Sequence, residues 1–91
     1  FAVYVYPRKD GQPFRLGVSV SKKIGNAVVR NRMRRRIKEA VRLNMDRIKD
    51  GYDIILIVRA RSLDLDFNGL QKSILHVLSR VSLTQRNRKQ M

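Results

Sequence analysis

Apolar and polar residues alternate in two segments near the start of the chain, residues 1–6 and 14–21. This period of two is typical of β-strands. Asp10-Gly11 lies between the segments and predicts a turn, so we expect the two strands to pair as a hairpin. One face of the hairpin would be apolar. The other face carries tyrosines, small residues and hydroxyls, namely Tyr4, Tyr6, Gly17, Ser19 and Ser21.

Two later segments repeat their apolar residues at steps of three and four, which is typical of amphipathic helices. The first, residues 27–49, would begin at an Asn26 cap and end at Asp50-Gly51. The second covers residues 67–81. We expect the methionines of the first apolar stripe to fill the core. That stripe consists of Val29, Met33, Ile37, Val41, Met45 and Ile48.

Residues 52–58 form a run rich in β-branched residues, which fits a strand buried on both faces. Residues 59–66 are expected to form a loop, and the polar, basic tail 84–91 to be frayed. The order strand, strand, helix, strand, helix predicts one α+β domain over residues 1–91. Its mixed sheet would pack with the helices, and the second strand, first helix and third strand would form a βαβ unit.

The charge is the unusual feature of the composition. Lys and Arg number 21 against 7 Asp and Glu, which leaves a net charge of +14 on 91 residues. Such a field destabilises the folded chain by self-repulsion, and a polyanion would relieve it. Nucleic acid is the leading candidate, and an anionic membrane surface is the alternative. No apolar run approaches the roughly 20 residues of a spanning helix, and the absence of cysteine excludes disulfides and thiolate metal sites.

The positive charge is concentrated in residues 22–36, at the start of the first helix. A helix N-terminus already carries partial positive charge, so cations there destabilise it, and the only acid nearby is Glu39. Bound phosphate would supply the compensation, because helix N–H groups and guanidinium groups both suit it. The alternative is a basic face that is merely solvated. The arginines are Arg30, Arg32, Arg34, Arg35 and Arg36.

Residues 17–36 resemble the signature of the bacterial ribonuclease P protein family. The resemblance rests on Gly17-Val18-Ser19-Val20-Ser21-Lys22-Lys23, then Gly25-Asn26-Ala27-Val28, then Arg30-Asn31-Arg32. It implies a ribosomal-protein-like fold whose βαβ unit has a rare left-handed crossover, where a right-handed one would be the default. The family also has an N-terminal helix with aromatic side chains that help to line a cleft. We expect this sequence to be a fragment that lacks that helix.

The resemblance further implies a division of labour. The catalytic RNA subunit, with Mg²⁺ held mainly by the RNA, would cut precursor tRNA and release its 5′ leader. This chain would then be a subunit of an endoribonuclease in the cytoplasm without being catalytic itself, and with no membrane or obligate protein partner. Tyr4 and Ser19 would lie in a leader-binding cleft. The residues placed near the catalytic RNA are Lys22, Lys23, Asn26, Arg30, Asn31, Arg32, Arg34, Arg35 and Lys38.

The residues themselves also favour a single-strand site on the polar face of the first strands. Tyr4 and Tyr6 share that face with Ser19, and aromatics beside hydroxyls and cations hold single strands without strict sequence readout. The alternative is that the tyrosines pack against the family's N-terminal helix.

Other polar residues have simpler interpretations. His76 stands alone among polar residues of the last helix and is expected to face solvent. Asp66 is expected to cap that helix, and Asp53 and Asp64 to be structural rather than metal-binding. Three cations of the tail could add weak phosphate contacts or do nothing, namely Arg86, Arg88 and Lys89.

Three other classes of protein compete with this interpretation. A different RNA-binding structural protein, such as a ribosomal protein, fits the composition but not the Lys22-to-Arg32 block. A protein nuclease acting alone would need clustered carboxylates or paired histidines, which the sequence lacks. A membrane-surface helix would need an apolar stripe that the sheet is expected to cover.

Overall fold

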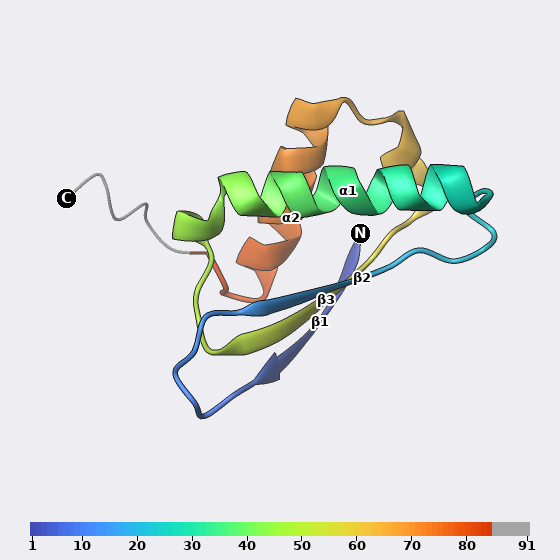
Figure 1. Ribbon diagram of the computed structural model, residues 1–91. Helices are drawn as coiled ribbons and strands as arrows, with labels where there is room; N and C mark the ends of the chain where they lie inside the picture. Colours follow the sequence, from blue (N-terminus) through green and yellow to red (C-terminus); the bar gives the residue numbers. More distant parts are fainter. Residues whose placement is uncertain (85–91) are drawn as a thin grey trace.

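The computed structural model describes residues 1–84, which form a three-stranded sheet with two α-helices packed on one face (Figure 1). The three cations of the tail named above lie outside these residues. No described helix is long and apolar enough to cross a membrane. The elements are β1 (Ala2–Pro7), β2 (Arg15–Ser19), α1 (Ala27–Leu43), β3 (Tyr52–Ile57) and α2 (Phe67–Arg80), with 3-10 turns at Met45–Arg47 and Ala60–Asp64.

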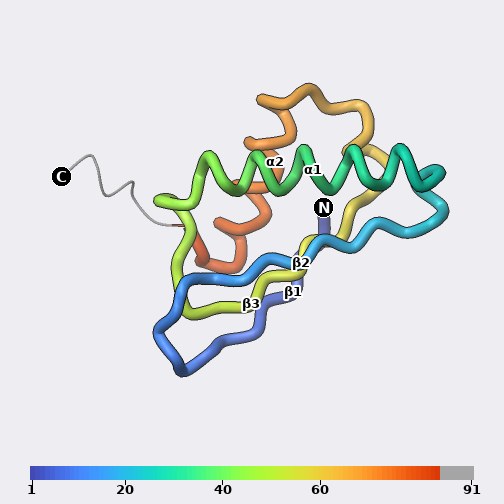
Figure 2. The backbone as a smooth tube through the Cα atoms, in the orientation of Figure 1, coloured from blue at the N-terminus to red at the C-terminus, as the bar shows by residue number. Residues whose placement is uncertain are grey.

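The strand order in the sheet is β1-β3-β2 (Figure 2), so the predicted hairpin is wrong. β1 pairs with β3 antiparallel, and β2 pairs with β3 parallel. β3 is the most apolar of the strands and takes the central place, where both of its edges are hydrogen-bonded. The connection from β1 to β2 is tied to the residue before β3 instead of forming a tight turn, because the Arg8 amide donates to the Gly51 carbonyl (2.7 Å) and the Gly51 amide to the Gln12 carbonyl (2.9 Å).

The parallel pairing of β2 and β3 across α1 confirms the βαβ unit, and the fold is α+β with a mixed sheet, as predicted. The left-handed sense of the crossover stays a prediction.

Only one face of β3 is buried, which corrects the expectation of burial on both. Ile54 and Leu56 point under the helices and are 1% and 0% exposed, whereas Ile55 between them is 36% exposed. The reason is that α1 and α2 lie on the same side of the sheet (Figures 1 and 2). The other side of the sheet is open in the described structure.

α1 begins where predicted and ends earlier. The Asn26 side chain accepts a hydrogen bond from the Val29 amide (3.0 Å), which confirms the cap. At the other end the Asn44 side-chain amide donates to the Ala40 carbonyl (2.7 Å) and to Gln71 of α2 (2.8 Å), which satisfies a helix-end carbonyl and ends the helix after Leu43.

The early end of α1 changes the roles of the residues that follow it. Met45 is 48% exposed, so its prediction as a core residue is wrong, while that of Met33 (2% exposed) is confirmed. Ile48 does reach the core, but through a β-bridge with Thr84 instead of a helical turn. The core consists of Val20, Met33, Ile37, Ala40, Val41, Ile48, Ile54, Leu56, Val58, Leu70, Ile74, Leu78 and Leu83.

Asp53 on the open face of β3 holds together one end of the sheet. Arg15 of β2 donates to both of its oxygens, Nε to Oδ1 at 2.7 Å and Nη2 to Oδ2 at 2.8 Å, and Arg8 Nη1 lies 3.4 Å from Oδ1. These contacts, with the hydrogen bonds from Arg15 foremost, hold the pKa of the Asp53 carboxyl below its usual range. Asp53 thus has the structural role that was expected.

Replacing Asp53 with Asn should lower the free energy of unfolding at neutral pH and flatten its acid dependence. A carboxyl whose pKa is lowered in the folded state stabilises the fold above its unfolded pKa, about 3.9, and loses that contribution as the pH falls through the lower folded value. Urea unfolding at a series of pH values measures both effects. Asp64→Asn is the control, because Asp64 has no ion pair in the described part of the chain. Equal acid dependence of wild type and Asp53→Asn would contradict the assignment.

Candidate nucleic-acid interface

A tight turn sets two lysines beside the start of α1. The Ile24 amide donates to the Ser21 carbonyl (3.0 Å) and the Lys23 amide to the Ser21 hydroxyl (3.2 Å), so Lys22 and Lys23 are exposed at the turn. Gly25 follows, and a Cβ atom there would lie 2.9 Å from Cγ1 of Val29. The chain therefore approaches the helix more closely than a larger residue would allow without displacing that side chain.

The cations of α1 lie on three sides of the helix instead of one. Successive helical residues turn by about 100°, so Arg30 and Arg32 lie on opposite flanks, and Asn31 lies on the outward crest between them. Arg30 is half-buried, and its Nε is buried without a hydrogen-bond partner in the described structure, whereas Arg32 is exposed. Arg34, on the Arg30 side, donates to the Asn31 side chain (3.0 Å).

The remaining charged residues of α1 differ in their freedom to bind an anion. Arg35 and Lys38 are exposed on the crest side. Arg36 is tied to the Leu65 carbonyl (3.0 Å) and is part of the packing between α1 and the segment before α2. Glu39 accepts two hydrogen bonds from Arg42, which lower the pKa of its carboxyl. Glu39 therefore neutralises the charge of Arg42. The first turn of α1 holds no acid, so the positive charge at the start of the helix is not neutralised.

The open face of the sheet brings the predicted cleft residues into ordered rows. Tyr4 and Gly17 both lie opposite Ile55, so the three form one row across the sheet. The neighbouring row on one side joins Tyr6, Asp53 and Arg15, and the neighbouring row on the other side joins Ala2, Ile57 and Ser19. Tyr4 and Tyr6 are 55% and 54% exposed.

Sequence reasoning missed the contribution of β3 to this face. Ile55 supplies an exposed apolar floor between Tyr4 and Gly17, but the predicted hairpin set β1 directly beside β2 and left no place for it. The signal that could have found it is the apolar run of residues 54–58, most of which lies in β3, because such a run favours the centre of a sheet.

The two candidate surfaces are continuous along the chain. β2 ends at Ser19 on the open face, and the chain then passes through Lys22 and Lys23 to the start of α1 (Figure 1). Single-stranded nucleic acid on the open face of the sheet, beside Tyr4 and Tyr6, would therefore extend toward the basic end of α1.

Residues 1–84 offer little for metal binding or acid–base chemistry. They contain no group of three or more His, Asp or Glu that could hold a metal ion. Asp10, Asp53 and Glu39 are each bonded to arginines. Asp66 caps α2 as predicted, by accepting a hydrogen bond from the Gly69 amide (2.7 Å).

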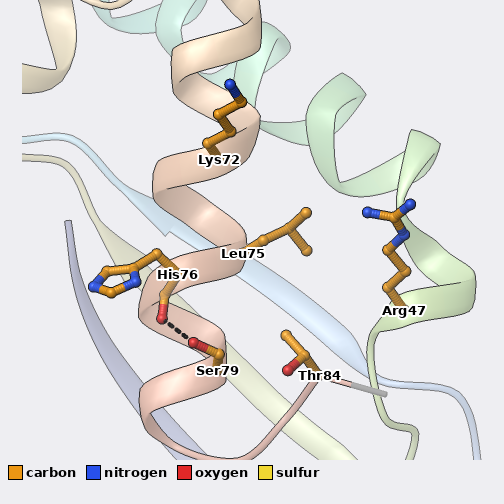
Figure 3. A pocket seen from close by; sticks show the side chains of 6 residues that line it. All are labelled: Arg47, Lys72, Leu75, His76, Ser79 and Thr84. Atoms are coloured by element: carbon orange, nitrogen blue, oxygen red, sulfur yellow. Dashed lines mark hydrogen bonds between the residues drawn. The ribbon is translucent and has the colours of Figure 1, made fainter. Parts of the chain in front are cut away.

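His76 lies beside a hollow of about 360 Å³ between α2 and the Met45–Arg47 turn (Figure 3). Leu75 points toward Arg47 across this hollow, whereas the His76 imidazole points away from both and is exposed (Figure 3). The Ser79 hydroxyl donates to the His76 carbonyl (2.7 Å) and not to the ring. The solvent-facing position expected for His76 is confirmed.

Comparison with known proteins identifies relatives along most of the chain. A profile of the family described as Ribonuclease P matches residues 1–82. The ribonuclease P protein component of Clostridioides difficile is 47% identical over 83 residues, which cover 90% of this chain and 72% of the relative. The solved ribonuclease P protein of Staphylococcus aureus has a TM-score of 0.78 at 40% identity, covering 91% and 75% of the two chains. That of Thermotoga maritima has a TM-score of 0.79 at 30% identity, covering 86% and 74%.

Sulfate should stabilise the fold beyond the effect of chloride at equal ionic strength, because an anion bound only by the native state raises its stability by mass action. Each 1 kcal/mol gained corresponds to about 4–8 °C in Tm for a domain of this size.

Thermal unfolding of matched variants separates a bound anion from a general salting effect. Arg30→Ala should lose part of the sulfate response. Arg42→Ala should keep it, since Arg42 is already bonded to Glu39. Identical sulfate responses in wild type and both variants would show that the helix start binds no anion.

Proposed function

This chain belongs to the ribonuclease P protein family, and we propose that it binds the catalytic RNA of the ribonucleoprotein through the start of α1 and the 5′ leader of precursor tRNA through the open face of the sheet. As a ribonuclease P component it takes part in tRNA processing. In the proposal, it positions the precursor so that the RNA removes the leader and forms the mature 5′ end.

The observation that carries the proposal is the uncompensated charge at the start of α1. Cations lie on both flanks and on the crest of the helix, and its first turn contains no acid. An RNA strand lying over the crest would meet Arg30 on one side and Arg32 on the other. Lys22, Lys23 and the capped helix N-terminus extend the same anion-binding surface. We assign catalytic-RNA contacts to Lys22, Lys23, Asn26, Arg30, Asn31, Arg32, Arg34, Arg35 and Lys38.

The leader site follows from the exposed tyrosines. Tyr4 and Tyr6 lie side by side on β1, and Ser19 lies at the end of the face that leads to the basic helix. Bases of any sequence can stack on such rings, so the site would hold a leader without strict sequence readout. The leader would run across the face with its cleavage-site end toward Ser19.

The chemistry of bond cleavage is assigned to the RNA. The donor set of residues 1–84 does not fit a Mg²⁺ site, since three of its carboxylates are bonded to arginines and no three potential ligands cluster. We therefore propose that Mg²⁺ is held mainly by the RNA and that the chain contributes binding and charge. We propose that residues 1–91 form one domain and that the protein works in the cytoplasm. The proposal requires neither a membrane nor an obligate protein partner.

The membrane alternative lacks a free apolar helix face. The apolar stripe of α1 is covered by the sheet and α2, with Met33, Ile37 and Val41 all buried. The helix therefore has no free apolar stripe to insert into lipid, and its exposed cations are left to bind an anionic partner.

Arg30→Ala and Arg32→Ala should each weaken binding to the catalytic RNA and reduce its salt dependence. Each lost phosphate contact should lower the slope of log affinity against log salt by roughly one. Filter binding across a salt series gives both quantities, with Arg42→Ala as the control. Unchanged slopes in both variants would mean that the helix start is merely solvated.

Tyr4→Ala should weaken binding of precursor tRNA to the assembled ribonucleoprotein far more than binding of mature tRNA, which lacks the leader. A lost aromatic–base stack costs about 1–3 kcal/mol, or about tenfold or more in affinity. The measurement is the ratio of the two Kd values. Equal losses for both tRNAs would assign Tyr4 to folding or RNA docking, and no loss for either would make it a packing residue.

A further inference from the structure

A small pocket opens on the Arg32 flank of α1. Its volume is about 280 Å³, or about nine water volumes, which is room for one flat heterocycle. Its lining residues belong to α1 and to the short 3-10 turn Ala60–Asp64, and this turn lies beside the basic half of the helix (Figure 1). Its lining comes from one stripe of α1 and from the 3-10 turn, and consists of Val29, Arg32, Met33, Arg36 and Leu63.

The lining of the pocket is partly apolar and partly cationic. Val29 and Met33 of α1 and Leu63 of the 3-10 turn, an exposed leucine at 37%, supply its apolar side chains. The two arginines stand along the same stripe of the helix. A phosphate alone would be desolvated against the apolar part of the lining, whereas the face of a nucleobase suits the apolar side chains and its polar edge suits guanidinium donors.

The two arginines differ in a way that fits base binding. Arg36 is held in place because its Nη2 donates to the Leu65 carbonyl (3.0 Å), so one wall is fixed before any ligand arrives. Arg32 is exposed and has no hydrogen bond or ion pair in the described part of the chain, so its planar guanidinium is free to stack on an inserted ring.

We propose that this pocket receives one unstacked nucleobase of the RNA bound to α1, so that the Arg32 flank recognises a base as well as phosphates. The inference rests on the proposed function, because it requires RNA on the helix crest. Residues 29–36 span about 10 Å of the helix, so the backbone of the same strand would remain within reach of the crest cations.

The decisive variant removes the apolar wall without removing charge. Leu63→Ser should weaken binding of the catalytic RNA by roughly fivefold, with the slope of log affinity against log salt unchanged, because no phosphate contact is lost. Leu43→Ser is the matched control, since Leu43 is an exposed leucine (53%) at the far end of the same helix. Leu63→Met, which keeps an apolar wall, should retain wild-type affinity, and thermal unfolding verifies that all three variants fold.

The outcomes separate this inference from the proposed function. Wild-type affinity in a folded Leu63→Ser variant, together with weakened binding by Arg30→Ala, overturns the base pocket alone. Wild-type affinity in both Leu63→Ser and Arg30→Ala overturns the RNA-binding role of α1 as well. A reduced salt slope in Leu63→Ser also overturns the base pocket, because the loss would then be one of phosphate contacts.

A direct readout uses adenosine monophosphate and inorganic phosphate as probes of the free protein. The methyl NMR resonances of Leu63, Met33 and Val29 should shift when adenosine monophosphate is added. They should not shift when inorganic phosphate is added to the same concentration of anionic charge. Equal shifts with both probes, or none with the nucleotide, would contradict base insertion.

Discussion

The positive charge at the start of α1 has no acid in the first turn of the helix to balance it, and the placement of the other acids explains why. Three ion-paired carboxylates of the described residues lie elsewhere: Asp10 and Asp53 bind arginines at the end of the sheet, and Glu39 binds Arg42 in the second half of the helix. Part of the excess positive charge of the chain is therefore left unbalanced at the start of α1, where the helix dipole is also positive. A polyanion would relieve this repulsion. β2, whose Ser19 lies on the same open face of the sheet as Tyr4 and Tyr6, ends close in sequence to the start of α1.

In the proposed function, the fold connects two binding surfaces, the start of α1 and the open face of the sheet. Because both helices cover the same side of the sheet, the other side is free to hold a single strand, with Ile55 as a floor between Tyr4 and Gly17. Because β2 runs directly into the basic turn, a substrate on the sheet and an RNA on the helix would be held by one rigid unit. Binding, orientation and charge neutralisation are what such a unit can supply, while Asp10, Asp53 and Glu39 are bonded to arginines of the fold.

Local signals in the sequence predicted most elements, and the errors arose where tertiary contacts decide. Asn26 and Asp66 act as caps because capping needs only the next few residues. The end of α1 could not be read from periodicity, since it depends on a contact between Asn44 and Gln71, 27 residues later. The prediction of a hairpin was wrong for the same reason. β1 and β2 are neighbours in sequence, but the apolar β3 lies between them in the sheet. The candidate residues were identified by charge and resemblance, but their division over both flanks of α1 required the helix geometry.

The central claim is that the chain is a charge-supplying cofactor of a catalytic RNA and not a nuclease. The most direct test is cleavage of precursor tRNA by that RNA over a range of magnesium concentrations, with and without the protein, and with the RNA-free protein alone. We expect the protein to accelerate cleavage most at low magnesium, where its cations replace those lost from the RNA, and we expect the protein alone to cut nothing. Magnesium-dependent cleavage by the RNA-free protein, or no acceleration at low magnesium, would contradict it.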